Sequence, residues 1–143
     1  MRKTFFRAKL EKTGEWIYWD MVGRITTKTG LISKLTIGHT YGEEDYYFSH
    51  QLWNKLDRGT LGQSTGMKDG FKNMIFEGDI LVGPNFDDDD GYGVVKLGKG
   101  GAWEVSNDRR CDAFHNIRVA HYDVIGNIHD NAKLLETEGN EKD

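Results

Sequence analysis

The residues best suited to acid–base or metal chemistry gather in one stretch, residues 111–130. A zinc site needs three or four such side chains to converge at about 2.0 to 2.3 Å from the ion. The spacings Cys-x3-His, His-x5-His and His-x7-His match no compact zinc pattern, so we predict no metal and no cofactor. A metal-dependent enzyme built on this cluster is kept as a minor alternative. The groups concerned are Cys111, Asp112, His115, His121, Asp123, His129 and Asp130.

Two further sets of carboxylates are candidates for calcium binding or acid–base catalysis. The run Asp87–Asp90 before Gly91 suggests calcium, but an EF-hand loop alternates its ligands and needs a glutamate at its twelfth position. Lys96 and Leu97 fall in that part of the stretch, so a solvated turn is favoured. Glu77 and Asp79 share one face of a predicted strand, yet no nucleophile or base accompanies them. We therefore predict that Asp79 accepts backbone hydrogen bonds in a turn.

The run Leu61–Gly70 resembles a phosphate-binding loop only in its glycines. It lacks the Gly-Lys-Ser/Thr ending and a following helix pattern, so a nucleotide site is rejected. Its expected role is conformational, with Gly66 supplying a positive φ and Lys68-Asp69-Gly70 forming a turn. Cys111 has no neighbouring base at a recognisable spacing, and we predict no catalytic residues.

Basic and aromatic residues alternate near the N-terminus. This composition is typical of a platform for single-stranded nucleic acid, where bases stack on rings and cations follow the phosphates. The same aromatics suit a small sheet core or a subunit interface, which we favour. The candidate contacts for nucleic acid are Arg2, Lys3, Arg7, Trp16 and Arg24.

The elements that must position these residues are mostly strands. Residues 3–10 and 15–19 predict a hairpin, residues 31–37 alternate as a half-buried strand, and residues 38–50 read as a loop or irregular edge. Leu52, Trp53 and Leu56 fall at helical spacing after Ser49, which predicts one short helix over residues 49–56.

Glycine turns organise the rest of the chain. Residues 60–64 enter a connection at 67–74, and residues 75–82 leave it as one strand with a bulge at Gly78. Residues 92–97 and 102–106 flank a glycine-rich turn and form a meander with 78–83, similar to small SH3-like barrels. Residues 117–122 and 123–128 are strand-like. Asp130 is expected to cap a final helix over 131–137 that buries Leu134 and Leu135.

Composition supports one mainly β domain. The 143 residues include 18 glycines but one proline, which indicates many tight turns rather than disorder. We expect a single domain over residues 1–135 and a disordered acidic tail over 136–143. The lone Cys111 favours a reducing cytoplasm, and the short apolar runs predict neither a signal peptide nor a membrane span. The net charge of −4 disfavours non-specific DNA binding.

Several motifs occur together in one order. An Arg7-Ala8 pair comes first, then Gln63-Ser64-Thr65-Gly66-Met67-Lys68-Asp69, then Glu77-Gly78-Asp79-Ile80, and finally Ile125-Gly126-Asn127-Ile128 before Leu134-Leu135. This order resembles the YopX family of phage and prophage proteins. The resemblance marks a structural signature made of Gln63, Thr65, Gly66, Lys68, Asp69, Glu77, Gly78, Asp79, Gly126 and Asn127.

The resemblance implies an architecture rather than an activity, since the biochemical role of the family is undefined. We expect a small, partly open barrel or meander of antiparallel strands with one or two short helices. The expected function is a non-enzymatic accessory protein in the host cytoplasm that binds a host or phage protein or assembles into a homo-oligomer. The alternative is a nucleic-acid-binding accessory protein that uses the N-terminal hairpin, and no membrane partner is expected.

Overall fold

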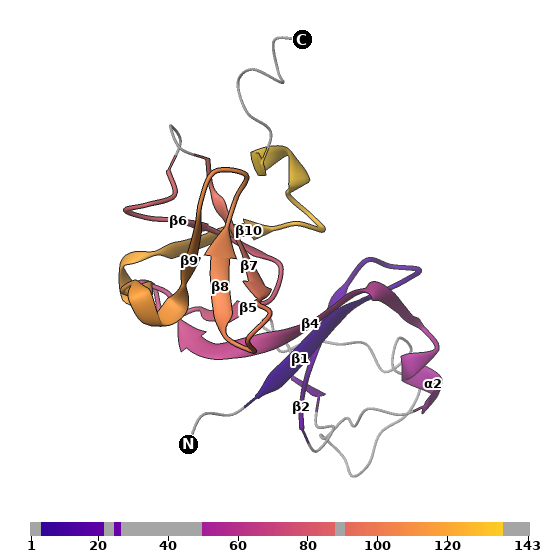
Figure 1. Ribbon diagram of the computed structural model, residues 1–143. Helices are drawn as coiled ribbons and strands as arrows, with labels where there is room; N and C mark the ends of the chain where they lie inside the picture. Colours follow the sequence, from indigo (N-terminus) through magenta and orange to yellow (C-terminus); the bar gives the residue numbers. More distant parts are fainter. Residues whose placement is uncertain (1–3, 22–24, 27–49, 88–90, 136–143) are drawn as a thin grey trace. The chain divides into compact units, whose positions relative to one another are not determined.

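Antiparallel strands make up most of the regular structure (Figure 1). The computed structural model describes residues 4–21, 25–26, 50–87 and 91–135. The strands are β1 (Phe5–Leu10), β2 (Trp16–Asp20), β3 (Ile25–Thr26), β4 (Leu56–Lys68), β5 (Met74–Phe76), β6 (Asp79–Val82), β7 (Gly93–Leu97), β8 (Trp103–Ser106), β9 (Cys111–Ala113) and β10 (Asp123–Asn127). The mainly β prediction is confirmed.

The helices of the described residues are short. They are α2 (His50–Trp53) and the 3₁₀ turns η1 (Phe114–Asn116), η2 (Val119–His121) and η3 (Ala132–Leu135). None of them has the length and hydropathy needed to cross a bilayer. The predicted strand 31–37, Asp88–Asp90 and the acidic tail 136–143 lie outside the described residues, as does the loop predicted over 38–50 apart from His50, which begins α2.

The strands form two five-stranded sheets, in the orders β3-β2-β1-β4-β5 and β10-β6-β7-β8-β9. The chain divides into two compact units, Met1–Ser64 and Thr65–Asp143, and β4 continues across the boundary. Each unit has its own apolar core. The single domain over 1–135 stays a prediction.

In the first unit, β1 pairs with β2 as the predicted hairpin and with β4 on its other side. Alternation along the strands turns Ala8 and Leu10 of β1, and Ile17 and Trp19 of β2, into the core. The helix was predicted over 49–56, but it ends at Trp53, and Leu56 joins the core from the start of β4 instead.

In the second unit, β6, β7 and β8 form the predicted meander, and β7 and β8 form its hairpin (Figure 1). The core contains residues from strands, loops and 3₁₀ turns: Ile75, Leu81, Phe86, Val95, Val105, Phe114, Val119 and Tyr122. The strand predicted over 117–122 is wrong, because η2 occupies Val119–His121 and turns Val119 and Tyr122 inward. The short strand β9 was not predicted.

The single strand predicted over 75–82 is also wrong. Gly78 has φ +88°, a turn conformation, so the chain reverses at Glu77-Gly78 and β5 and β6 belong to different sheets. Glu77 is therefore exposed while Asp79 is buried, and the two carboxylates do not share a strand face.

Within the described residues, the predicted C-terminal helix is the 3₁₀ turn η3 over Ala132–Leu135, and residues 136 and 137 of the prediction lie outside them. Leu134 and Leu135 keep 37% and 36% of their surface exposed, so the prediction that they are buried is wrong. Their exposure leaves apolar surface at this end of the chain.

Candidate functional site

The carboxylate of the signature aspartate Asp69 accepts four hydrogen bonds from the chain itself. Oδ1 accepts the backbone N–H of Phe71 at 2.9 Å and of Asn73 at 2.8 Å. Oδ2 accepts the N–H of Val124 at 2.9 Å and the Asn73 amide Nδ2 at 3.3 Å. Asp69 is 3% exposed. The carboxylate therefore fixes the turn over residues 69–73 and ties it to the start of β10.

These contacts decide the charge of Asp69. Burial by itself raises the pKa of this carboxyl, but the hydrogen bonds from Val124, Asn73 and Phe71 favour the charged form and leave its pKa below 3.8. The Asp69 carboxylate stays ionised, and both of its oxygens accept hydrogen bonds from the chain, so its role is structural. It is a poor general base.

The glycine after Asp69 brings the same turn close to the backbone of residues 120–123. Gly70 N–H donates to the Tyr122 carbonyl at 2.8 Å. A Cβ at Gly70 would lie 2.8 Å from both the Ala120 carbonyl oxygen and Asp123 Oδ1. No larger residue fits without displacing backbone, so a glycine is required at position 70 by the packing of this turn.

The second signature block has an equivalent role. Phe76 N–H donates to Asp79 Oδ2 at 2.8 Å across the Glu77-Gly78 turn, which is the role predicted for Asp79. Gly78 N–H donates to the Val95 carbonyl, and the Gly78 carbonyl accepts the N–H of Ile128. This turn thus connects β7 with the segment that follows β10.

Four of the remaining signature residues, Thr65, Gly66, Gly126 and Asn127, shape the backbone or pack against it. Gly66 has φ +82° within β4, as predicted, and the neighbouring Thr65 hydroxyl accepts the N–H of Met67 at 3.1 Å. Asn127 Oδ1 accepts the N–H groups of His129 and Asp130 at 2.9 Å each. A Cβ at Gly126 would meet the side chain of Asn131. Gln63 and Lys68 are exposed on β4.

The potential metal ligands of residues 111–130 lie on separate elements. Among the described residues, no three His, Cys, Asp or Glu side chains are placed to hold a metal ion. His115, His121 and His129 are exposed, on η1, on η2 and after β10. Cys111 is exposed, and partial desolvation together with the adjacent Glu104 raises the pKa of its thiol, which makes it a weaker nucleophile at neutral pH.

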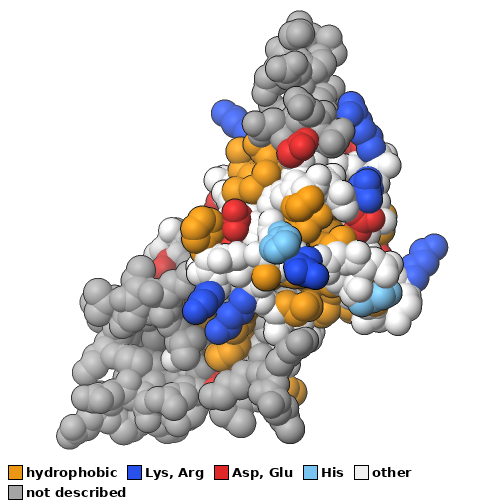
Figure 2. Space-filling view, turned by 90° about the vertical axis from the view of Figure 1, so that its left-hand side faces the viewer, with side chains coloured by type: hydrophobic (Ala, Val, Ile, Leu, Met, Phe, Trp, Pro, Cys, Tyr) orange, Lys and Arg blue, Asp and Glu red, His pale blue; other side chains and the backbone are white. Residues whose placement is uncertain are grey.

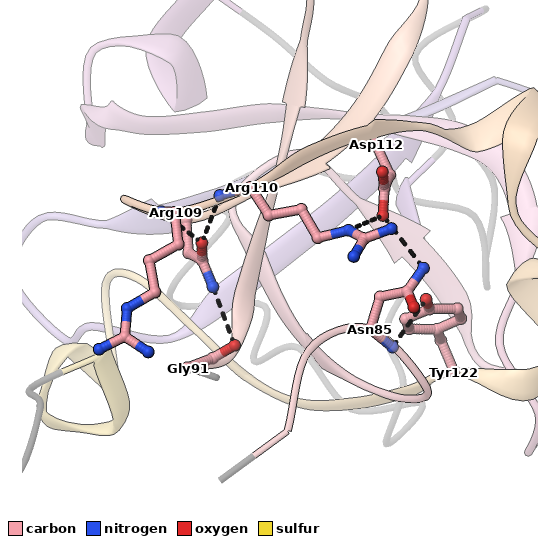
Figure 3. Close-up of polar contacts among 7 residues, drawn as sticks. Asn85, Gly91, Arg109, Arg110, Asp112 and Tyr122 are labelled. Atoms are coloured by element: carbon pink, nitrogen blue, oxygen red, sulfur yellow. Dashed lines mark hydrogen bonds and ion pairs between the residues drawn. The ribbon is translucent and has the colours of Figure 1, made fainter. Parts of the chain in front are cut away.

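Asp112 of that stretch takes part in a cluster of polar side chains (Figure 3). Its Oδ2 accepts Arg110 Nε at 2.7 Å and Asn85 Nδ2 at 3.2 Å, while the Asn85 N–H donates to the Tyr122 hydroxyl at 3.3 Å. Burial raises the pKa of Tyr122, so this hydroxyl stays protonated at neutral pH. The cluster joins β9 to the loop after β6.

The neighbouring loop is organised by Asn107. Its Oδ1 accepts the N–H groups of Arg109 and Arg110 at 2.8 and 2.9 Å, and its Nδ2 donates to the Gly91 carbonyl at 3.0 Å (Figure 3). The sequence offers only an Asn-Asp-Arg-Arg turn signal for this loop. Asn85 and Tyr122 carry no motif, so sequence reasoning missed them.

The candidate nucleic-acid contacts are only partly described. Arg2, Lys3 and Arg24 lie outside the described residues. Arg7 is 3% exposed, and its guanidinium lies 4.6 Å from the centre of the Trp16 ring, which Lys9 Nζ also approaches at 5.5 Å. The cations and the ring of this hairpin thus contact one another, which leaves little of Trp16 for stacking on a base.

Comparison with known proteins agrees with the structural signature. The family model described as YopX protein matches residues 5–136, nearly the whole chain and both compact units. No curated protein matches. The match covers both aspartate-centred turns and the Gly126-Asn127 segment, so the chain belongs to the YopX family.

Proposed function

We propose that this protein is a non-enzymatic accessory protein of a phage or prophage, acting in the host cytoplasm as a protein-binding or self-assembling module. The observation that carries the proposal is the state of the signature carboxylates. Asp69 and Asp79 are buried at 3% and 2% exposure, and both accept hydrogen bonds from the chain's own backbone. These two signature carboxylates thus hold turns together rather than facing solvent.

The exposed surface of the described residues supports binding. Phe71 lies at the centre of the turn that Asp69 organises, and 75% of its surface is exposed. Apolar side chains also remain exposed at Met21, Leu97, Ile125 and Ile128. On the face drawn in Figure 2, hydrophobic side chains lie at the surface among Lys, Arg, Asp and Glu. Exposed apolar groups surrounded by charges are typical of protein contacts.

Affinity capture of the full chain from phage-infected cells tests this function, with protein and nucleic-acid readouts after nuclease treatment. We expect nuclease-resistant complexes that contain either a second copy of the chain or another protein. Complexes that disappear with nuclease would replace the proposal with a nucleic-acid function. Purification as a lone chain under all capture conditions would also contradict it.

A further inference from the structure

We propose that the chain closes the outer edge of β10 against strand addition, with one turn fastened at each end of the strand. The turn over residues 69–73 covers the start of this edge, and the turn over residues 127–131 covers its end. An extended segment of another protein therefore cannot lengthen the sheet along β10. The inference goes beyond the proposed function, because it concerns a contact that the folded chain prevents.

In the described part of the chain, β10 and β9 are the two edge strands of their sheet. An edge strand presents N–H and C=O groups with which an extended polypeptide can pair. β9 has only three residues and leads directly into η1, so it offers a short edge. β10 has five residues and pairs with β6. It is therefore the edge at which addition of a foreign strand has to be prevented.

The hydrogen bonds show which backbone groups of β10 point away from β6. Successive residues of an antiparallel strand direct their N–H and C=O groups alternately toward the partner strand and away from it. Ile128 N–H donates to the Gly78 carbonyl on the side of β6, so Asn127 points away. A bulge follows Val124, whose N–H donates outside the sheet, so Tyr122 and Val124 point away before it. A bulge also twists an edge out of regular pairing.

At the start of β10, the turn that follows β4 engages these outward groups. Asp69 Oδ2 accepts the Val124 N–H at 2.9 Å, and Gly70 N–H donates to the Tyr122 carbonyl at 2.8 Å. The Tyr122 N–H donates to the Val119 carbonyl at 2.9 Å. Two donors and one acceptor with which an added strand would pair are thus engaged by the chain itself.

At the end of β10, Asn131 engages both outward groups of Asn127. Its Oδ1 accepts the Asn127 N–H at 3.1 Å, and its own N–H donates to the Asn127 carbonyl at 2.8 Å. A Cβ at Gly126 would lie 2.5 Å from Asn131 Oδ1, so the glycine allows this close approach. Gly70 has the same role at the start of the strand. Both covering turns therefore fit against the edge at a glycine.

Sedimentation velocity of the purified full chain over a concentration series tests the inference. Asp69→Ala opens the start of the edge, and Asn131→Ala opens its end. We expect each variant to associate more strongly than wild type, with an apparent association constant raised about tenfold or more. Infrared spectra of the associated protein should show added intermolecular β-sheet. Circular dichroism verifies that each variant is folded, and Asn131→Ala decides the test if Asp69→Ala does not fold.

Gly93→Ala is the control for a loss of stability alone. Gly93 is the first residue of β7, and a Cβ there would lie 2.9 Å from Phe86 Cδ1 in the core of the second unit. The substitution therefore strains the same unit while both turns still cover β10. We expect Gly93→Ala to associate as wild type does. The comparison separates an opened edge from a partly unfolded chain.

A lysine on the opened edge sharpens the test, because a charged side chain on an edge strand opposes strand addition. Ile125→Lys places this charge on β10, where Ile125 is 37% exposed. Leu97→Lys introduces the same charge on β7, away from the edge, where Leu97 is 51% exposed. In the background of either edge variant, we expect Ile125→Lys to restore the association constant of wild type and Leu97→Lys to change it less than about twofold.

Three results would overturn the inference. A folded edge variant that associates as wild type does would show that its turn does not keep strands from this edge. Equal association of Gly93→Ala and the edge variants would assign the effect to lost stability. Equal rescue by the two lysine substitutions would place the contact outside β10. Each of these results leaves the proposed function standing, since the capture experiment tests that function separately.

Discussion

Both compact units contain antiparallel strands and a small apolar core, but different side chains satisfy the backbone N–H groups outside regular strand pairing. In the second unit, buried carboxylates hold the turns, with Asp69 and Asp79 each accepting backbone N–H groups. In the first unit, side-chain hydroxyl groups accept backbone N–H groups where the pairing of β1 and β4 is irregular. Thr60 Oγ1 accepts the Lys9 N–H at 2.8 Å where β1 and β4 shift register, and Ser64 Oγ accepts the Phe5 N–H at 2.9 Å.

The difference parallels the distribution of the predicted signature residues along the chain. Nine of the ten predicted signature residues fall at or beyond Thr65, in the unit whose turns depend on charged side chains and on glycines. A hydroxyl that supplements a ladder can be replaced at modest cost. A buried carboxylate that satisfies several donors cannot, because its removal leaves all of them without a partner.

Replacing Asp69 should therefore have the largest effect. Asp69→Ala removes the acceptor of three backbone N–H groups, and we expect a loss of about 3 kcal/mol or more in the free energy of unfolding. Asp69→Asn keeps one carbonyl oxygen and should cost less. Urea unfolding followed by circular dichroism measures both. Equal stability of wild type and Asp69→Ala would contradict the structural role.

The next largest loss in the free energy of unfolding should come from replacing Gly93, a glycine in the core of the second unit. A Cβ at Gly93 would collide with Val105 and lie 2.9 Å from Phe86 Cδ1, so Gly93→Ala should cost about 1 to 3 kcal/mol by overpacking. At Gly100 a Cβ meets nothing within 4 Å, and Gly100→Ala serves as the control. Thermal unfolding of both variants tests the contrast. Similar melting temperatures would show that the core accommodates the extra methyl group.

In the first unit, among substitutions that remove a polar contact, Trp16→Leu should cause the largest loss in the free energy of unfolding. Trp16→Leu removes the ring beside the buried Arg7, and we expect a loss of about 1 to 2 kcal/mol. Trp53→Phe is a milder comparison, because Arg58, 5.5 Å from the Trp53 ring, is exposed and solvated. A double-mutant cycle with Arg7→Met isolates the Arg7–Trp16 interaction. A coupling energy near zero would contradict it.

The smallest expected effect is the change with pH of the stability that Asp69 contributes. Because the pKa of Asp69 is lowered on folding, its contribution is fully present above 3.8, the ordinary pKa of the group, and is lost as the pH falls through the lower folded value. The stability difference between wild type and Asp69→Asn should thus shrink as the pH drops below about 3.8. Urea unfolding at pH 7 and pH 3 tests this. A constant difference would show that the charge of Asp69 is immaterial.

Local patterns predicted much of the fold. The hairpin of β1 and β2 and the hairpin of β7 and β8 follow from alternation and glycine turns. The positive φ of Gly66 also follows from its residue type. Prediction failed where long-range packing decides the structure. Residues 117–122 alternate like a strand, yet Val119 and Tyr122 are buried from a 3₁₀ turn.

The site was less accessible to sequence reasoning. The motif containing Asp69 was found, but its partner Val124 lies 55 residues away and no spacing rule connects them. The Asn85, Asp112 and Tyr122 contacts arise in the same way, from segments that meet only after folding. Exposure of Phe71 was not predicted either, because a phenylalanine is more often part of a core.

Residue-resolved hydrogen exchange of wild type and Asp69→Ala tests the central claim most directly. If Asp69 is a structural clamp of the second unit, the amides of Phe71, Asn73 and Val124 should lose protection, while the amides of β1 and β2 keep theirs. Unchanged protection at those three amides would contradict the clamp. An equal loss in β1 and β2 would contradict the independence of the two units.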